Sequence, residues 1–459
     1  MAGVLMVAQP VVAKAESLAD AMVSAYRHSG LLEQNRALLR AADEDVATAV
    51  GALRPVLAWS ASYSRGRGRT FNSRTMLSSA RSTRSEINIQ VFAELLLYDG
   101  GQSRMRIDAA KEVVLATRQG LRGVEQQILL RAVAAFYDVR RQTEFVRLGK
   151  NNVRVIGQEL RAARDRFEVG EVTRTDVSLA EARLAGARAA LAASEGLLSQ
   201  AREEYRAATG HYPGKLSNPP KPPSIAKSEK SAKAIAVQAH PDMIRTRHTV
   251  TAAEIAIAIA EAAMSPTVTM SAGISNTQDF ETRDFTNGAS VGVNLSGPIY
   301  SGGRLSSAVR KARHQRDAER AGLHTVRHAV YQGVGNAWSQ WEMARASRAA
   351  SEGQVRASRV AFEGVREEAK LGARTTLDVL DAEQELLDAR ANLISAGIDE
   401  QVARYNVLAS MGWLTAERLK LRVPHYDPAE YYNMVKDAPH ILSDRGQKLD
   451  KVLRSLGKE

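Results

Sequence analysis

The sequence predicts a mixed α and β protein, mainly helical, that is built from two tandem structural repeats. Three observations carry this prediction: several landmarks recur 202 residues apart, two long stretches contain no proline, and four short segments alternate between apolar and polar residues. Each repeat is expected to run helix, strand, loop, strand, long helix, turn and helix, because hydrophobic period and chain breakers change in that order.

The repeat is visible in landmarks that share one offset. Residues 167–177 return as residues 369–379, and the glycine, threonine and aspartate of Gly-x-x-Thr-x-x-Asp-Val fall at the same places. The other matching landmarks are Tyr98-Asp-Gly100-Gly101 with Tyr300-Ser-Gly302-Gly303, Phe136 with Trp338, and Thr209-Gly210 with Met411-Gly412. One offset across separate landmarks indicates two copies of one large unit.

Composition shifts divide the chain. Residues 1–12 are apolar and small, and Ala13-Lys-Ala15 follows them, so we expect a signal-peptide remnant over residues 1–15 with a mature start near Glu16. The first repeat is expected over 16–216, a Pro-rich linker over 217–237, and the second repeat over 238–420. The remaining residues, 421–459, contain three prolines and are expected to form an irregular tail.

Proline marks the long helices. None lies between Pro55 and Pro213 or between Pro298 and Pro424, and proline costs about 3 kcal/mol inside a helix. The stretch from Gln102 to Arg166 has no strong stop signal. A helix of that size would be roughly 100 Å long, which no compact domain contains.

The strands are expected where the period changes to two. In these segments apolar residues alternate with small or polar ones, which is typical of half-buried strands. Each pair brackets a loop with turn residues, so two hairpins are predicted. The predicted strands are residues 55–65, 85–97, 266–275 and 288–297.

Composition and motif content exclude several functions. The net charge of +12 comes with interleaved acidic and basic residues, which predicts a solvated surface and no nucleic-acid partner. The absence of cysteine excludes disulfides, thiolate metal sites and a cysteine nucleophile. His314, His324 and His328 lack a further ligand motif, so exposed helix histidines are favoured over a metal site. We expect no enzyme and no cofactor.

The strand count implies assembly. Four strands cannot close a barrel, and an open sheet in lipid leaves unpaired edges that cost several kcal/mol per group. Two chains would supply eight strands and a filled interior, whereas three would supply twelve and leave room for a pore.

These features resemble the TolC outer-membrane efflux family. The resemblance covers about residues 16–420 and rests on the doubled unit, the strand pairs that end in Tyr-x-Gly-Gly, the Gly-x-x-Thr-x-x-Asp-Val turns and Ala239-His-Pro-Asp242. It implies a homotrimer whose twelve-stranded barrel in the outer-membrane lipid continues as a twelve-helix periplasmic tunnel. Such a duct works with a periplasmic adaptor and an inner-membrane transporter in drug efflux or type I secretion, so the cargo would be small toxic compounds, proteins or both.

The resemblance also implies site residues. Asp378 and Asp381 match the carboxylates that line the periplasmic entrance, where threefold symmetry would make each a ring. Arg374 with Thr175 and Asp176 matches the latch between hairpins, and a bond from Asp176 to Arg374 is expected. The family tyrosine of this latch is replaced by Ala369. Adaptor docking is expected at the Gly170 and Gly372 turns, and strand-to-helix bends are expected at Gly100, Gly101, Gly302 and Gly303.

Alternatives stay open at several of these positions. Asp378 and Asp381 could simply cap and solvate a helix start, and the same holds for Asp176. Trp59 and Tyr63 could belong to an interfacial aromatic girdle or to ordinary strand packing. For the whole chain, the alternative is a periplasmic coiled-coil adaptor or scaffold that never enters the membrane.

Overall fold

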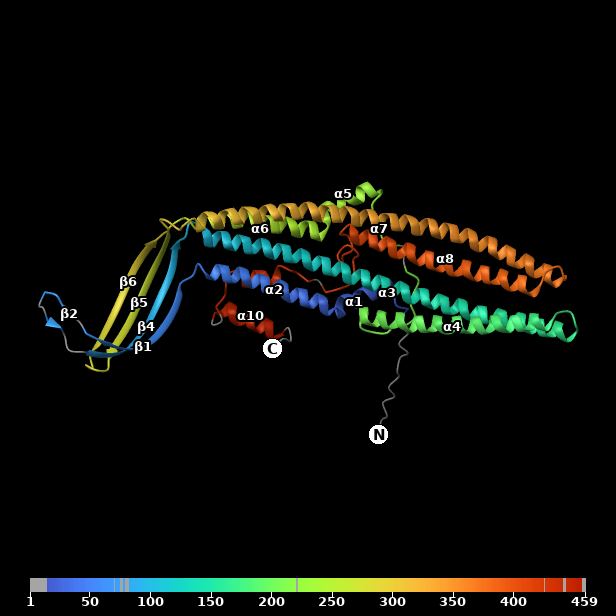
Figure 1. Cartoon of the computed structure of the whole chain (residues 1–459), viewed down its shortest axis with the longest axis horizontal. Helices are drawn as coiled ribbons and strands as arrows, with labels where there is room; N and C mark the ends of the chain where they lie inside the picture. The colour runs from blue at the N-terminus through green and yellow to red at the C-terminus, as the bar shows by residue number, and fades with distance from the viewer. Residues whose placement is uncertain are drawn as a thin grey trace, which may run out of the picture. The chain divides into compact units, whose positions relative to one another are not determined.

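The computed structural model describes residues 15–69, 71–74, 77–78, 82–219, 222–424, 426–440 and 443–455. It contains the predicted mixture of long helices and a small antiparallel sheet (Figure 1). In chain order the elements are α1 (Leu18–His28), α2 (Gly30–Gly51), β1 (Val56–Gly68), β2 (Phe71–Asn72), β3 (Leu77–Ser78), β4 (Ser82–Tyr98), α3 (Gln102–Glu168), α4 (Arg174–Thr209), α5 (Glu229–Ala239), α6 (Pro241–Ala262), β5 (Thr267–Asp279), β6 (Phe285–Ser296), α7 (Arg304–Lys370), α8 (Thr376–Ser410), α9 (Glu430–Val435) and α10 (Asp444–Ser455).

The repeat has two offsets, and only one of them was predicted from the sequence. The long helices α3 and α7 have 67 residues each and begin 202 residues apart, at Gln102 and Arg304. The upstream elements are also duplicated, but at 211 residues: α1 and α5 begin at Leu18 and Glu229, and β1 and β5 begin at Val56 and Thr267. The difference lies in the first hairpin, whose longer loop contains β2 and β3. The fold class predicted from the repeat is confirmed.

Several boundaries differ from the expected ones. The strands overlap the predicted ranges but run further toward the loop ends, so most of 276–287, predicted as a loop, is strand in β5 and β6. The segment 421–459, expected to be irregular, contains α9 and α10. The predicted linker, 217–237, includes the first turns of α5. The expected signal remnant falls on residues outside the described part of the chain, apart from Ala15.

The chain divides into two units. The hairpin unit contains the chain up to Arg36, Gln119–Ile244 and Thr325–Tyr426, and the sheet unit contains Ala37–Arg118, Arg245–His324 and the chain from Asp427 onward. In the hairpin unit, α3 pairs with α4 and α7 with α8 as long helical hairpins. Many of the buried residues are alanine, including Ala132, Ala180 and Ala389. Such small side chains let helix backbones approach closely.

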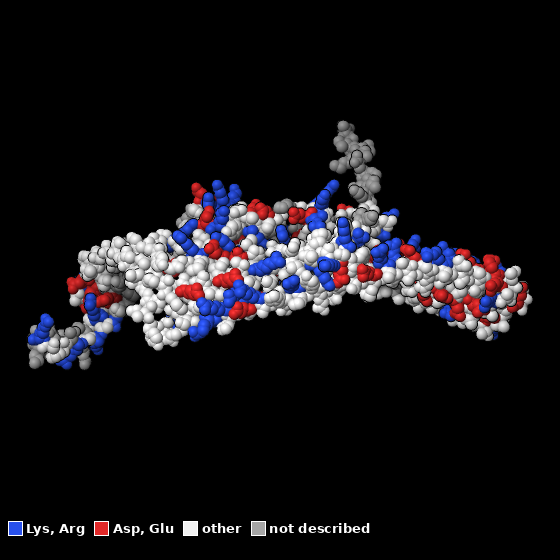
Figure 2. Space-filling model, turned by 90° about the horizontal axis from the view of Figure 1, so that it is seen from above, with Lys and Arg blue, Asp and Glu red and all other residues white. Residues whose placement is uncertain are grey.

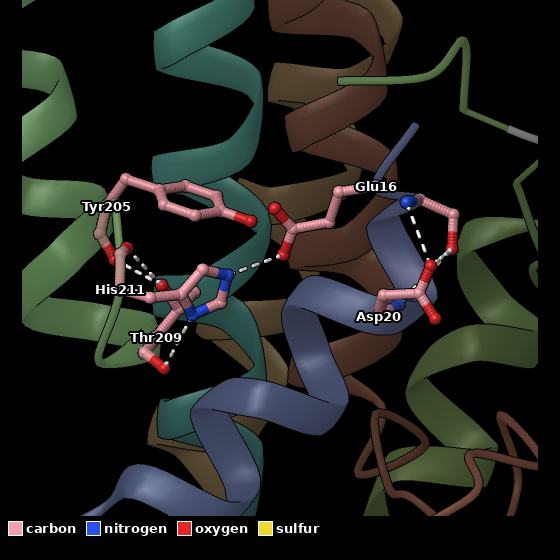
Figure 3. A network of polar contacts seen from close by, with 6 residues as sticks. Glu16, Asp20, Tyr205, Thr209 and His211 are labelled. Carbon is pink, nitrogen blue, oxygen red and sulfur yellow. Dashed lines mark hydrogen bonds and ion pairs between the residues drawn. The ribbon is translucent and has the colours of Figure 1, made fainter. Parts of the chain in front are cut away.

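The start of the described chain is anchored to the end of α4 (Figure 3). The backbone N–H of Glu16 donates to the carbonyl of Lys215 at 2.9 Å, and its carboxylate lies 3.0 Å from Nε2 of His211. The hydroxyl of Tyr205 points toward the same carboxylate. Burial and this carboxylate raise the pKa of Tyr205, which therefore stays neutral. Ser17 and Asp20 then form a capping box that starts α1.

Among the described residues, the helices do not include one that is both long and apolar enough to cross a membrane.

Candidate functional site

The register of the four-stranded sheet gathers apolar side chains on one face. The strands pair antiparallel in the order β1-β4-β5-β6. Trp59 lies opposite Val91, and Val91 lies opposite Ile274. Two residues further along, Leu57 is aligned through Ala93 and Ala272 with Val291. Because residues directly opposite each other share a face, the apolar positions of all four strands form one continuous surface.

The opposite face of the same sheet is mostly polar or small, with Phe92 and Leu96 as exceptions. Ser60 lies opposite Gln90, Gln90 opposite Ser275, and Ser275 opposite Gly288. On this face the Asn88 amide donates to the hydroxyl of Thr277 at 2.7 Å. A sheet with one apolar and one polar face is suited to separating lipid from water.

The apolar face is uncovered in the single chain. Trp59 is 75% exposed and Val291 is 74% exposed. On the face drawn in Figure 2, charged atoms are sparse over much of the sheet and mix along the helices. Within the described residues, β1 and β6 have no hydrogen-bonded neighbour on their outer sides. The sheet therefore presents an apolar surface and two open edges, both of which need a partner in lipid.

Glycine pairs connect this sheet to the long helices. Gly100 and Gly101 follow β4 with φ of 68° and 82°, and Gly302 and Gly303 precede α7 with φ of 59° and 81°. Side chains disfavour this left-handed region, which explains glycine at both bends. At Gly100 a Cβ atom would also lie 2.7 Å from Cβ of Ser265. Asp99 caps α3 by accepting a hydrogen bond from the N–H of Ser103 at 2.7 Å.

At the other ends of the long helices, both hairpin turns have the same construction. Gly170 and Gly372 adopt φ of 79° and 78°. Thr173 and Asp176 form a capping box at the start of α4, and Thr375 and Asp378 form the equivalent box at the start of α8. The duplicated Thr-x-x-Asp spacing therefore has a local structural cause, because each box satisfies backbone N–H groups that a helix start leaves free.

The two carboxylates predicted for the gate lie in different surroundings. Asp378 accepts hydrogen bonds from the N–H and hydroxyl of Thr375, at 2.9 and 2.8 Å, and these bonds lower the pKa of Asp378. Asp381 accepts a hydrogen bond from Nη2 of Arg183 at 2.6 Å. The helix-capping alternative thus describes Asp378 in the single chain, whereas Asp381 joins α8 to α4.

The predicted latch bond between Asp176 and Arg374 is not present in this chain. Nε of Arg374 donates to Glu368 at 2.8 Å, on the other side of the Gly372 turn. The carboxylate of Asp176 is occupied by its own capping box, whose hydrogen bonds lower its pKa. Thr175, the third latch residue, is exposed on the first turn of α4. Local partners, which are a few residues away in sequence, therefore hold both ends of the expected bond.

Contacts between the two hairpins, which were not predicted from the sequence, join α4 to α8 and α3 to α7. Arg183 pairs with Asp381, and Arg366 of α7 lies 3.6 Å from Glu159 of α3. Glu383 of α8 is 8% exposed, and its Oε2 is buried without a hydrogen-bond partner. Burial raises the pKa of Glu383 to about 7, with a further contribution from Glu159. The sequence signal that could have indicated these contacts is divergence between the repeats. The residues at the matching positions of the other repeat cannot form the same ion pairs.

Among the described residues, His, Asp and Glu do not form a group of three or more that could hold a metal ion.

The sequence matches a known protein family over most of its length. The family model described as "Outer membrane efflux protein" matches residues 22–211 and 234–412. Outer membrane efflux protein BepC of Brucella suis biovar 1 is 38% identical over 93% of this chain and 91% of its own. Outer membrane protein TolC of Vibrio cholerae is 28% identical over 69% of this chain and 74% of its own.

Solved structures show the same fold. The CmeC outer membrane channel of Campylobacter jejuni superposes with a TM-score of 0.75 over 92% of this chain and 90% of that one, at 14% sequence identity. The family resemblance inferred from the repeat is therefore confirmed. The chain belongs to the outer membrane efflux protein family and is an efflux channel of the outer membrane, not an enzyme.

Proposed function

We propose that three copies of this chain form the exit duct of a tripartite efflux or type I secretion system. Twelve strands would close a barrel in the outer membrane, and twelve long helices would continue it as a tunnel in the periplasm. The observation that carries this proposal is the sheet itself. It has one apolar face, one polar face and two open edges, so it satisfies its backbone in lipid only when edges of neighbouring copies pair.

The number of copies follows from strand number. Two copies would give eight strands, and side chains fill the interior of a barrel of that size. Three copies give twelve strands and leave space for passage. The paired hairpins α3–α4 and α7–α8 support the same symmetry, because each chain contributes two similar helical units to a ring of six.

The gate is assigned to Asp378 and Asp381 at the tunnel entrance. They lie three residues apart near the start of α8, and symmetry would repeat each of them three times. The depressed pKa keeps Asp378 ionised at neutral pH, and a ring of carboxylates attracts cations and repels anions.

The latch is assigned to Arg374, Thr175 and Asp176. In the closed assembly, an N–H group of Arg374 that is not held by Glu368 would reach Asp176.

Partners are assigned to the two ends of the assembly. The apolar face of the sheet contacts outer-membrane lipid. A periplasmic adaptor docks at the Gly170 and Gly372 turns, where Val169 is 70% exposed and Leu371 is 87% exposed. The adaptor connects the duct to an inner-membrane transporter. A wide duct does not need a substrate pocket, so the transporter selects the cargo, whether small toxic compounds or proteins.

The proposal is tested by cell fractionation and by conductance. The chain should be recovered in outer membranes, and the purified protein should form cation-selective channels in planar bilayers. Replacing Asp378 with Asn should reduce the preference for cations. Recovery in the soluble periplasm, the behaviour of an adaptor or scaffold, would overturn the duct. Unchanged selectivity of the Asp378→Asn variant would remove that carboxylate from the gate.

A further inference from the structure

We propose that Arg183 is a positioning residue of the gate, and that its ion pair with Asp381 ties the first hairpin (α3–α4) to the second (α7–α8) and keeps the entrance closed. This inference rests on the proposed function, because it takes these hairpins to surround the entrance. It gives the two gate carboxylates different tasks: Asp378 supplies charge to the pore, whereas Asp381 holds two hairpins together.

The geometry places this pair between hairpins. Arg183 lies on α4, in the first repeat, and Asp381 lies on α8, in the second repeat. Nη2 of Arg183 donates to Oδ1 of Asp381 at 2.6 Å. A guanidinium that donates to a carboxylate makes a charge-assisted hydrogen bond, which is stronger than a hydrogen bond between neutral groups.

An apolar contact next to the pair supports it. Leu160 of α3, Ala180 of α4 and Leu380 of α8 form one buried cluster, with Val177 and Leu184 packed against it. Ala180 precedes Arg183 by one turn, and Leu380 adjoins Asp381. The cluster therefore brings the two helices together at the point where the ion pair forms, and it limits access of water from one side.

The pair breaks the symmetry between the repeats. At the repeat offset, Arg183 corresponds to Glu385 and Asp381 corresponds to Leu179. With the roles of the repeats exchanged, the equivalent contact would place Glu385 opposite Leu179, and these two residues cannot form an ion pair. In a ring of six alternating hairpins, the tie would occur three times, at every second junction. Loss of the tie would remove one of the contacts that hold each second hairpin to its first hairpin.

The effect should depend on the number of copies. The side chains are 39% and 57% exposed, and exposed ion pairs shift an equilibrium by only about two- to fivefold each. Three equivalent ties released together multiply this effect to roughly 10- to 100-fold. An opening equilibrium of the trimer is therefore a more sensitive readout than the stability of one chain.

The test is charge exchange in the full-length trimer, measured as open probability in planar bilayers. Arg183→Glu and Asp381→Arg should each raise the open probability by roughly 10-fold or more, and the double variant should return close to the parent. Arg183→Lys keeps the charge and should stay near the parent. Arg164→Glu is the matched control, because Arg164 pairs with Glu181 inside the first hairpin at similar exposure. This control should leave the open probability unchanged.

Open probability is the appropriate readout because Asp381→Arg also changes the charge of the entrance. The amount of trimer in outer membranes, measured for each variant, separates opening from failed assembly. A double variant that is as open as the single variants would overturn the tie, and so would single variants that stay closed. Separate measurements test the ion pair and the gate charge. Open probability of the Arg183 and Asp381 variants tests the ion pair, whereas cation selectivity of Asp378→Asn tests the gate charge and leaves Arg183 and Asp381 unchanged.

Discussion

The carboxylate of Asp378 accepts two hydrogen bonds from Thr375, one from its backbone N–H at 2.9 Å and one from its hydroxyl at 2.8 Å. These bonds stabilise the ionised form of Asp378 and lower its pKa. A group with a depressed pKa contributes stability above its ordinary value, and this contribution is lost as the pH falls through the lower, folded value. The capping box that starts α8 therefore also keeps Asp378 of the proposed gate ionised to a lower pH.

Replacing Thr375 with Ala should therefore change both the stability of the protein and the pH dependence of its cation selectivity. The loss of a threonine cap costs about 1 kcal/mol in other helices. The pKa of Asp378 should rise toward its ordinary value, so the variant should lose its cation preference at a higher pH than the parent. The measurement is the reversal potential, titrated from neutral pH to about pH 3.

Thr173→Ala is the matched control for this change. It removes the equivalent capping box from α4, where Asp176 has the corresponding role, and it should lower stability without moving the pH dependence of selectivity. If both variants changed selectivity equally, the assignment of Asp378 to the pore would be wrong.

Buried Glu383 should make stability depend on pH. Its pKa of about 7 lies above the ordinary value of 4.5 because of burial and Glu159, and Arg366 and Arg390 oppose the shift. The folded protein therefore binds this proton more tightly than the unfolded chain does. Stability should fall as the pH rises from about 4.5 to 7 and then level off. Glu383→Gln should remove this loss and raise the free energy of unfolding at pH 8 by roughly 3 kcal/mol per chain.

Thermal unfolding of the detergent-solubilised protein, followed against pH for both forms, measures this effect. Glu385→Gln, on the same helix, is the control, and it should follow the parent. If the stability of Glu383→Gln depended on pH as the parent's does, the folded protein would not bind the Glu383 proton more tightly than the unfolded chain does, and the predicted rise in its pKa would be wrong.

The local parts of the structure were predictable from sequence, whereas contacts between helices were not. Each predictable feature lies within a single element of the chain. These features are the alternation in the strands, the absence of proline in α3 and α7, and the Thr-x-x-Asp boxes. The 211-residue offset was hidden because the upstream elements of the two repeats share shape and little sequence. Arg183 and Asp381 are 198 residues apart, and only the packing of α4 on α8 brings them together.

The bend at Gly100 should be less tolerant of substitution than the bend at Gly101. Both residues have positive φ, so Ala is strained at either position by about 1 kcal/mol. At Gly100 the added Cβ would also meet Ser265, whereas at Gly101 it would meet open space. Gly100→Ala should therefore reduce the amount of assembled protein in outer membranes more than Gly101→Ala. An equal reduction for both variants would mean that the positive φ alone, and not the contact with Ser265, makes Gly100 intolerant of substitution.

The two faces of the sheet should respond differently to charge. Val291 lies on the apolar face, and Ser290 lies on the polar face beside it. Val291→Arg should cost about 2–4 kcal/mol if this residue is in lipid, and little trimer should reach the outer membrane. Ser290→Arg should assemble and change the conductance. Good assembly of Val291→Arg, as judged by heat-resistant trimer on a gel, would contradict the lipid-facing assignment.

The proposed barrel closes only if the open edges of neighbouring copies pair, and cysteine cross-linking detects that pairing. The native chain has no cysteine. Within one chain, β1 and β6 are separated by two strands, a distance of roughly 14 Å, which is beyond the ~7 Å limit for a disulfide. Ser60→Cys in β1 is combined in turn with a cysteine at each polar-face position of β6: Thr286, Gly288, Ser290, Gly292 and Asn294. We predict that at least one register yields covalent trimers and no larger species. Monomers at every register, or ladders beyond three chains, would rule out a closed trimer.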